Sequence, residues 1–137
     1  MSKLLQRLRD ASRSGVYRTG NPAAVLEATR GADLDVVTIE GGGKEKLLQN
    51  IARALDFPRW FGGNWDALED SLGDLSWREG AGHILLFTTY PAGGELGVLI
   101  DVLRSVAEYW AGRGKPFFAV FIDAQRKLEL PDLYRAA

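Results

Sequence analysis

The 137-residue sequence contains no cysteine, a single histidine and a single methionine. Without cysteine the chain can form no disulfide framework, no thiolate metal site and no thiol nucleophile, and a reducing intracellular setting is compatible with it. No apolar segment approaches the roughly 20 residues that span a membrane. The first residues alternate leucines with basic residues and lack the uninterrupted apolar run of a signal peptide. We therefore expect a cytoplasmic protein with no membrane partner.

Composition and charge indicate one globular domain and a preference for basic partners. Hydrophobic residues make up 46% of the chain and charged residues 26%, which leaves enough apolar side chains for a sizeable core. The net charge of −1 hides an uneven distribution, because residues 56–79 carry six acidic groups against two arginines. Such a stretch repels nucleic-acid phosphates and attracts a basic protein surface. We therefore expect a protein partner and no nucleic acid.

The most informative stretch is residues 57–70, which reads Phe-Pro-Arg-Trp-Phe-Gly-Gly-Asn-Trp-Asp-Ala-Leu-Glu-Asp. Its proline and its two glycines, Gly62 and Gly63, favour a loop. Asn64 is a favoured N-cap, since its side chain can accept a hydrogen bond from the first unpaired helix amides. The stretch therefore predicts an aromatic loop followed by a helix that begins at about Trp65.

Helical spacing divides this predicted helix into an apolar face and an acidic one. The apolar face consists of Trp65, Leu68, Leu72 and Leu75. The opposite face carries three carboxylates at four-residue spacing, which we call the acidic ridge: Asp66, Asp70 and Asp74. The helix dipole favours acids only in the first turn, and carboxylates four residues apart repel each other. The ridge is therefore either a solvated surface or a binding surface for a positively charged partner.

Aromatic residues beside the acidic ridge favour the binding interpretation. Trp60, Phe61 and Trp65 surround the glycine-rich loop, and aromatic residues next to charges are typical of interface hot spots. A packing role competes with this one, because Trp65 lies on the apolar face. We expect Trp65 and one of the other two aromatic residues to belong to the core.

The rest of the chain alternates predicted helices and strands. Hydrophobic periodicity predicts helices over residues 2–14, 22–30, 44–55 and 96–110, and strands over residues 34–39, 83–90 and 117–122. This alternation predicts an α/β fold with a small three-stranded parallel sheet, right-handed crossovers and extra N-terminal helices.

Two other functions use residues of the same chain. A carboxylate-based hydrolase would use Asp66, Glu69 and Asp70 as acid and base, whereas the only histidine, His83, opens an apolar strand and is expected to be structural. Carboxylates on one exposed helix supply too few ligands for a divalent cation, so we expect no metal. A nucleotide site would use the glycine-rich turn at residues 41–44, which lacks the spaced glycine and the hydroxyl residue of a P-loop. We therefore expect no cofactor.

From residue 34 to about residue 122 the chain resembles the barstar family of intracellular ribonuclease inhibitors, chiefly through the motif at residues 57–70. The resemblance implies a barstar-like domain over residues 34–122, a helical extension over residues 1–33 and a C-terminal tail over residues 123–137. It also implies a monomeric, non-enzymatic immunity protein without catalytic residues. Its acidic helix and aromatic loop would plug the active site of a basic ribonuclease, a barnase-like enzyme or another nuclease toxin.

The resemblance assigns partner-binding roles to individual residues. Asp70 matches the main interfacial aspartate of the family, and Asp66 matches the second. Trp60 replaces a tyrosine that packs on the nuclease, and Gly62 and Asn64 match loop residues. The predicted surface also includes the flanking residues Gly63, Glu69 and Asp74.

Three departures from the family pattern leave the target open. A glutamate of the long helix contacts the nuclease in the family; Glu108 lies near that place, and Tyr109 is the alternative. Glu69 stands where the family has a tryptophan, and Gly73-Asp74 replaces threonine-glycine. A different basic protein partner therefore remains the alternative to a ribonuclease.

Overall fold

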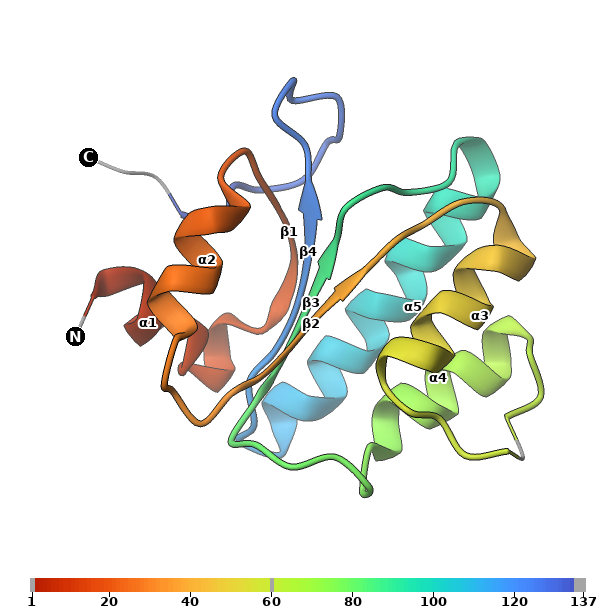
Figure 1. The fold of residues 1–137 in the computed structure, drawn as a ribbon, viewed down its shortest axis with the longest axis horizontal. Coiled ribbons are helices and arrows are strands. Elements are labelled where there is room, and N and C mark those ends of the chain that lie inside the picture. Colours follow the sequence, from red (N-terminus) through yellow and green to blue (C-terminus); the bar gives the residue numbers. More distant parts are fainter. Residues whose placement is uncertain (1, 60, 135–137) are drawn as a thin grey trace.

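A four-stranded parallel sheet organises the computed structural model, which describes residues 2–59 and 61–134 (Figure 1). The strands lie in the order β1-β4-β3-β2, and all neighbours are parallel. Their bounds are Gly15–Thr19 for β1, Asp35–Ile39 for β2, His83–Phe87 for β3 and Phe117–Ile122 for β4. The helices are α1 (Lys3–Leu8), the 3-10 helix η1 (Ala11–Arg13), α2 (Pro22–Thr29), α3 (Lys44–Ala54), α4 (Trp65–Asp74) and α5 (Gly93–Gly112).

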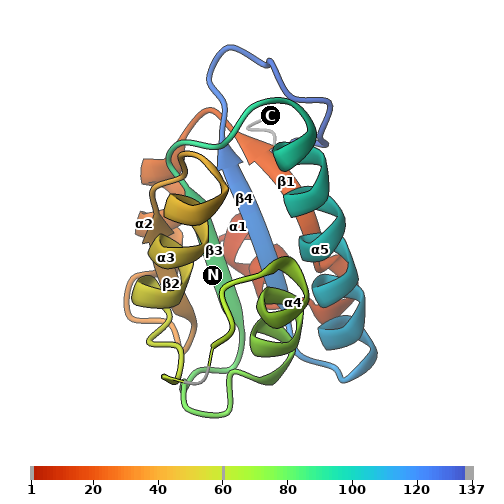
Figure 2. The ribbon, with the colours of Figure 1, turned by 90° about the vertical axis from the view of Figure 1, so that its right-hand side faces the viewer.

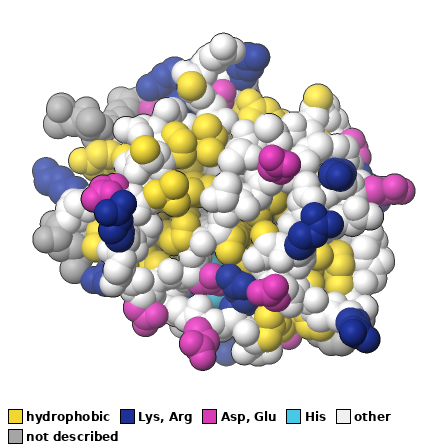
Figure 3. Space-filling model, in the orientation of Figure 1, with side chains coloured by type: hydrophobic (Ala, Val, Ile, Leu, Met, Phe, Trp, Pro, Cys, Tyr) yellow, Lys and Arg dark blue, Asp and Glu magenta, His cyan; other side chains and the backbone are white. Residues whose placement is uncertain are grey.

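Helices cover both faces of the sheet. Helices α1 and α2 lie on one face, and α3, α4 and α5 lie on the other (Figures 1 and 2). Seen in the orientation of Figure 1, the surface carries a patch of hydrophobic side chains near α2, and charged side chains of both signs are spread over the rest of it (Figure 3). None of the described helices is both long enough and apolar enough to cross a membrane.

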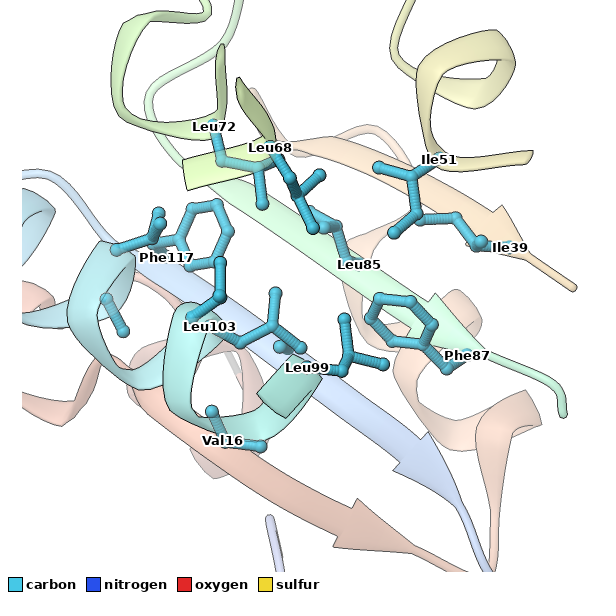
Figure 4. Close-up of a cluster of buried hydrophobic side chains, with 14 of the residues drawn as sticks. Val16, Ile39, Ile51, Leu68, Leu72, Leu85, Phe87, Leu99, Leu103 and Phe117 are labelled. Carbon is cyan, nitrogen blue, oxygen red and sulfur yellow. The ribbon is translucent and has the colours of Figure 1, made fainter. Parts of the chain in front are cut away.

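The larger hydrophobic core lies between the sheet and the layer of α3, α4 and α5 (Figure 4). Leu68 and Leu72 of α4 meet Leu85 of β3 and Leu103 of α5, and none of these side chains is exposed. A smaller core lies on the α1 and α2 face and includes Ile84. Successive residues of β3 are thus buried on opposite faces, as its continuous apolar run predicts.

The expected three-stranded sheet is wrong by one strand. Strand β1 comes from residues 1–33 and pairs with β4, with Val16 opposite Ala119 and Thr19 opposite Ile122. The sequence pattern does not reveal this strand because it carries a charged residue, Arg18, which is only 5% exposed. A buried charge breaks the apolar run by which buried strands are recognised.

Residues after β4 supply the partners of Arg18. Arg18 forms an ion pair with Asp132, and its Nε lies 3.5 Å from Asp123 Oδ2. The Arg18 backbone N–H donates to the Pro131 carbonyl at 2.9 Å, and the Leu133 N–H donates to the Arg18 carbonyl at 2.9 Å. Residues 131–133, expected to belong to a tail, therefore lie along the outer edge of β1 and cover it.

Two local signals in the sequence determine backbone features of the structure. Asn21 caps α2, as its place before Pro22 predicts, with its Oδ1 accepting from the Ala24 N–H at 3.2 Å. Gly41, in the turn after β2, passes so close to the end of β3 that a Cβ would lie 2.4 Å from the Thr89 carbonyl oxygen. Only glycine permits this approach, which sets the path from β2 into α3.

Candidate protein-binding site

Helix α4 begins at Trp65, as the sequence predicts. The Asn64 side chain accepts a hydrogen bond from the Ala67 N–H at 2.7 Å, which satisfies one of the unpaired amides of the first turn. Gly63 has a φ of +71°, a left-handed conformation that favours glycine. Burial of Leu68 and Leu72 turns the opposite face of α4 toward solvent.

The outward face of α4 carries exposed carboxylates. Asp66, Asp70 and Asp74 of the acidic ridge are exposed, and so is Glu69. Within residues 2–59 and 61–134, none of the four forms an ion pair. Asp74 accepts a hydrogen bond from the Ser76 N–H at 3.3 Å, so it also helps to end the helix. The other carboxylates are therefore available for charges that another molecule supplies.

A groove of about 310 Å³ runs between α4 and α5, which lie side by side in Figure 2. Its walls consist of Glu69, Asp70 and Gly73 on α4, and of Ser105, Val106 and Tyr109 on α5. Tyr109 is 49% exposed, although its ring contacts that of Trp110 at a centroid distance of 5.4 Å. Gly73 contributes no side chain to fill the groove. Two free carboxylates and an exposed aromatic ring thus face one hollow.

The structure separates the two candidate residues of the long helix. Glu108 lines a different hollow, between α5 and β1, together with Asp101 and Arg104. Tyr109 alone of the pair shares the groove with Asp70. Sequence reasoning did not select Ser105 as a groove residue, although its four-residue spacing from Tyr109 places both on one side of a helix.

The loop before α4 is fixed by an aromatic cluster. The Phe57 ring lies 4.9 Å from the ring of Phe61 and 5.9 Å from that of Trp77. Trp77 Nε1 donates to the Leu55 carbonyl at 2.8 Å, which ties the cluster to the end of α3. Phe61 is partly buried against the core, as is Trp65, whereas Trp60 lies outside the described residues.

Comparison with protein families identifies the part of the chain that holds this groove. A family model described as Barstar (barnase inhibitor) matches residues 34–122. The chain belongs to the barstar family. The match runs from the residue before β2 to the end of β4 and includes α4 and α5, whereas β1 and residues 131–133 lie outside it. No curated protein matches the chain.

The single histidine of this barstar family member is buried in the fold and bonded to an aspartate. His83 is fully buried, and its Nδ1 lies 2.9 Å from Asp35 Oδ2. Arg78 binds the same carboxylate, with Nη2 2.6 Å from Asp35 Oδ1. Burial lowers the pKa of His83 despite the hydrogen bond to Asp35. Burial alone would raise the pKa of Asp35, but its hydrogen bonds with Arg78 and His83 lower it.

A carboxylate of the chain itself binds the glycine-rich turn of this barstar family member. The Lys44 N–H, at the start of α3, donates to Glu95 Oε2 at 3.0 Å. One of the amides that bind a phosphate at a helix N-terminus is therefore paired with the protein's own carboxylate. Among the described residues, no group of three or more histidine, aspartate or glutamate side chains is arranged to hold a metal ion.

Proposed function

We propose that this protein is a stoichiometric, non-catalytic inhibitor of a ribonuclease and acts inside the cell that produces the enzyme. The observation that carries the proposal is the groove between α4 and α5, where the free carboxylates of Glu69 and Asp70 face the exposed ring of Tyr109. Membership of the barstar (barnase inhibitor) family, over the residues that build this groove, supports it.

Charge complementarity explains how such a surface blocks a nuclease. A ribonuclease active site binds RNA phosphates through cationic side chains, and the carboxylates of Asp70 and Asp66 present the same charge to them. Arginine binds a carboxylate through two parallel hydrogen bonds, which strengthen when water is excluded. Asp70 is proposed as the central contact and Asp66 as the second. The loop residues proposed to surround them are Trp60, Gly62, Gly63 and Asn64, and the flanking acids are Glu69 and Asp74.

A titration into a barnase-type ribonuclease that cleaves a fluorogenic RNA tests the proposal. We expect cleavage to stop at one equivalent of inhibitor. Asp70→Asn keeps the size of the side chain and removes its charge, and we expect it to weaken inhibition at least about 30-fold, the range of an interfacial hot spot. Asp101→Asn makes the same change at an exposed site of α5 outside the groove, and serves as the control.

Two outcomes would contradict the proposal in different ways. Inhibition that is equally strong with Asp70→Asn would show that the charge of Asp70 does not contribute to the interface. Absence of inhibition by the folded protein would favour the second candidate, a basic partner other than a barnase-type nuclease. The specific feature behind this candidate is Glu69, which adds a second carboxylate to the groove at a place where the family has tryptophan.

A further inference from the structure

A second hollow adjoins the groove between α4 and α5. It has a volume of about 530 Å³ and lies between α5, residues 14–17 and Pro131, and we call it the β1 hollow. Ser105, on the exposed side of α5, lines both the groove and the β1 hollow, so the two depressions meet at this residue. The family match begins at residue 34, so one wall of the β1 hollow comes from a part of the chain outside that match.

Two oppositely charged side chains of α5 line the β1 hollow. Arg104 and Glu108 are exposed, and within residues 2–59 and 61–134 neither forms an ion pair, although they lie four residues apart on one helix. The Phe117 N–H donates to Ser14 Oγ at 3.0 Å, so the start of β1 lies next to the chain that leaves the end of α5. Glu108 is therefore near the start of β1, and Asp101 lies toward the opposite end of the hollow.

Strand β1 adds free backbone groups to the same hollow. The N–H and the C=O of Arg18 point to the outer edge of the strand, where they bond to residues 131–133. Val16, two residues earlier in the strand, directs its own N–H and C=O to this edge as well. Val16 lines the β1 hollow, and no described residue hydrogen-bonds its backbone groups. Unpaired groups on a strand edge can bind an extended segment of another protein.

Helix α4 by itself is a small binding surface. Its ten residues extend over about 15 Å, whereas a standard interface uses about 20–30 residues on each side. A partner on the groove must therefore also contact a neighbour of α4, which lies between α3 and α5 in Figure 2. The two neighbours differ in charge. The exposed charged residues of α3 are Glu45, Lys46 and Arg53, and those of α5 are Glu95, Asp101, Arg104 and Glu108. A basic partner is therefore repelled by α3 and attracted toward α5 and the β1 hollow.

We propose that the ribonuclease that binds the groove also fills the β1 hollow, so that β1 belongs to the partner-binding surface. This inference rests on the proposed function. The matching part of the nuclease is an extended segment with a basic side chain, which pairs with Glu108, beside an acidic one, which pairs with Arg104. Its backbone bonds to the free groups of Val16. Two pairs of opposite sense select among basic nucleases, because a segment with two like charges would be repelled at one position. Asp101 lies outside this contact.

Two arginine variants test the contact by the direction of their effect on inhibition of a barnase-type ribonuclease. Arg104→Ala and Arg53→Ala each remove one exposed positive charge that has no ion pair among the described residues. Long-range attraction to a basic enzyme should therefore be unchanged or stronger in both. We expect this for Arg53→Ala, whereas Arg104→Ala should weaken inhibition about 5-fold because it removes an ion pair at the interface. A loss confined to Arg104→Ala cannot arise from net charge.

Hydrogen exchange at two amides of β1 gives a second test that needs no substitution. The Val16 N–H has no partner in the described part of the free protein, so one equivalent of the ribonuclease should slow its exchange at least about 10-fold. The Arg18 N–H is the control. It already donates to the Pro131 carbonyl at 2.9 Å, so its exchange should be slow with and without the nuclease.

The outcomes distinguish this inference from the proposed function. A parent protein that does not bind the nuclease would overturn the proposed function and this inference together. Suppose instead that the parent inhibits and that Asp70→Asn weakens inhibition as proposed. Equal inhibition by Arg104→Ala and Arg53→Ala, with no slowing of exchange at Val16, would then overturn only the extension of the interface to β1.

Discussion

The indole N–H of Trp110, on α5, donates a hydrogen bond to the backbone carbonyl of Leu72, on α4, at 2.9 Å. Leu72 lies in the last turn of α4, where carbonyls lack partners within the helix. Trp110 is only 8% exposed, so this bond is formed away from water. It fixes the α4 wall of the groove relative to the α5 wall.

Trp110→Phe should therefore destabilise the protein. The variant leaves a buried carbonyl without its donor, and we expect the free energy of unfolding to fall by about 1–3 kcal/mol. Urea denaturation followed by circular dichroism measures this change. Tyr109→Phe, at the exposed neighbouring position, is the control and should leave stability within about 0.5 kcal/mol of the parent. Equal stability of Trp110→Phe and the parent would show that the hydrogen bond does not hold α4.

Tyr109→Ala should weaken binding of the ribonuclease about 10-fold, because it removes the aromatic wall beside Asp70. Tyr109→Phe keeps the ring and should retain most of the affinity. Glu108→Gln should have the smaller effect, since Glu108 lines the hollow on the β1 side of α5. Binding kinetics on an immobilised nuclease compare the three variants. A larger loss for Glu108→Gln than for Tyr109→Ala would reverse this assignment.

The association rate should fall as salt is added. Exposed carboxylates attract a basic partner over distances of about 10 Å at 0.1 M ionic strength, and salt screens this attraction. Stopped-flow fluorescence from low to high salt measures the effect, with the dissociation rate expected to change little. The double variant Asp66→Asn with Asp70→Asn should show a shallower salt dependence. An identical slope for this variant would mean that the acidic ridge does not steer association.

Stability should decrease as the pH falls below about 6.5, the ordinary pKa of histidine. Because burial lowers the pKa of His83 in the folded protein, the unfolded chain takes up a proton first, and protonation favours unfolding. The stability that comes from keeping His83 neutral is fully present above pH 6.5, and it is lost as the pH falls toward the pKa of His83 in the folded protein. Urea titrations at pH 7.5 and 5 measure the loss, and His83→Gln should reduce it. A higher stability at pH 5 than at pH 7.5 would contradict the lowered pKa of His83.

Arg18→Met should cost about 3–5 kcal/mol, because it leaves the carboxylates of Asp123 and Asp132 without their buried partner. It should also release residues 131–133 from β1, which limited proteolysis would detect as faster cleavage after β4. Arg126→Met is the matched control. Arg126 also binds Asp132, at 3.2 Å, but its side chain is 67% exposed, and its loss should cost at most about 1 kcal/mol.

The sequence by itself determined the local structure of the site. The N-cap at Asn64, the glycines before it and the apolar spacing of Leu68 and Leu72 all act within a few residues, so the start of α4 and its acidic outward face follow from the chain alone. The apolar runs of β3 and β4 identified the buried strands in the same way. These features can be read from the sequence because the interactions that cause them join residues close together in the chain.

Only the tertiary structure decided the fourth strand and the composition of the groove. Strand β1 pairs with β4, and its Arg18 meets Asp132, a residue 114 positions away in the chain; no periodic pattern encodes either pairing. Tyr109, and not Glu108, faces Asp70 because the packing of α5 on the sheet sets the rotation of the helix. These features depend on the balance of buried charge and side-chain packing between distant segments, which is settled only when the whole chain is folded.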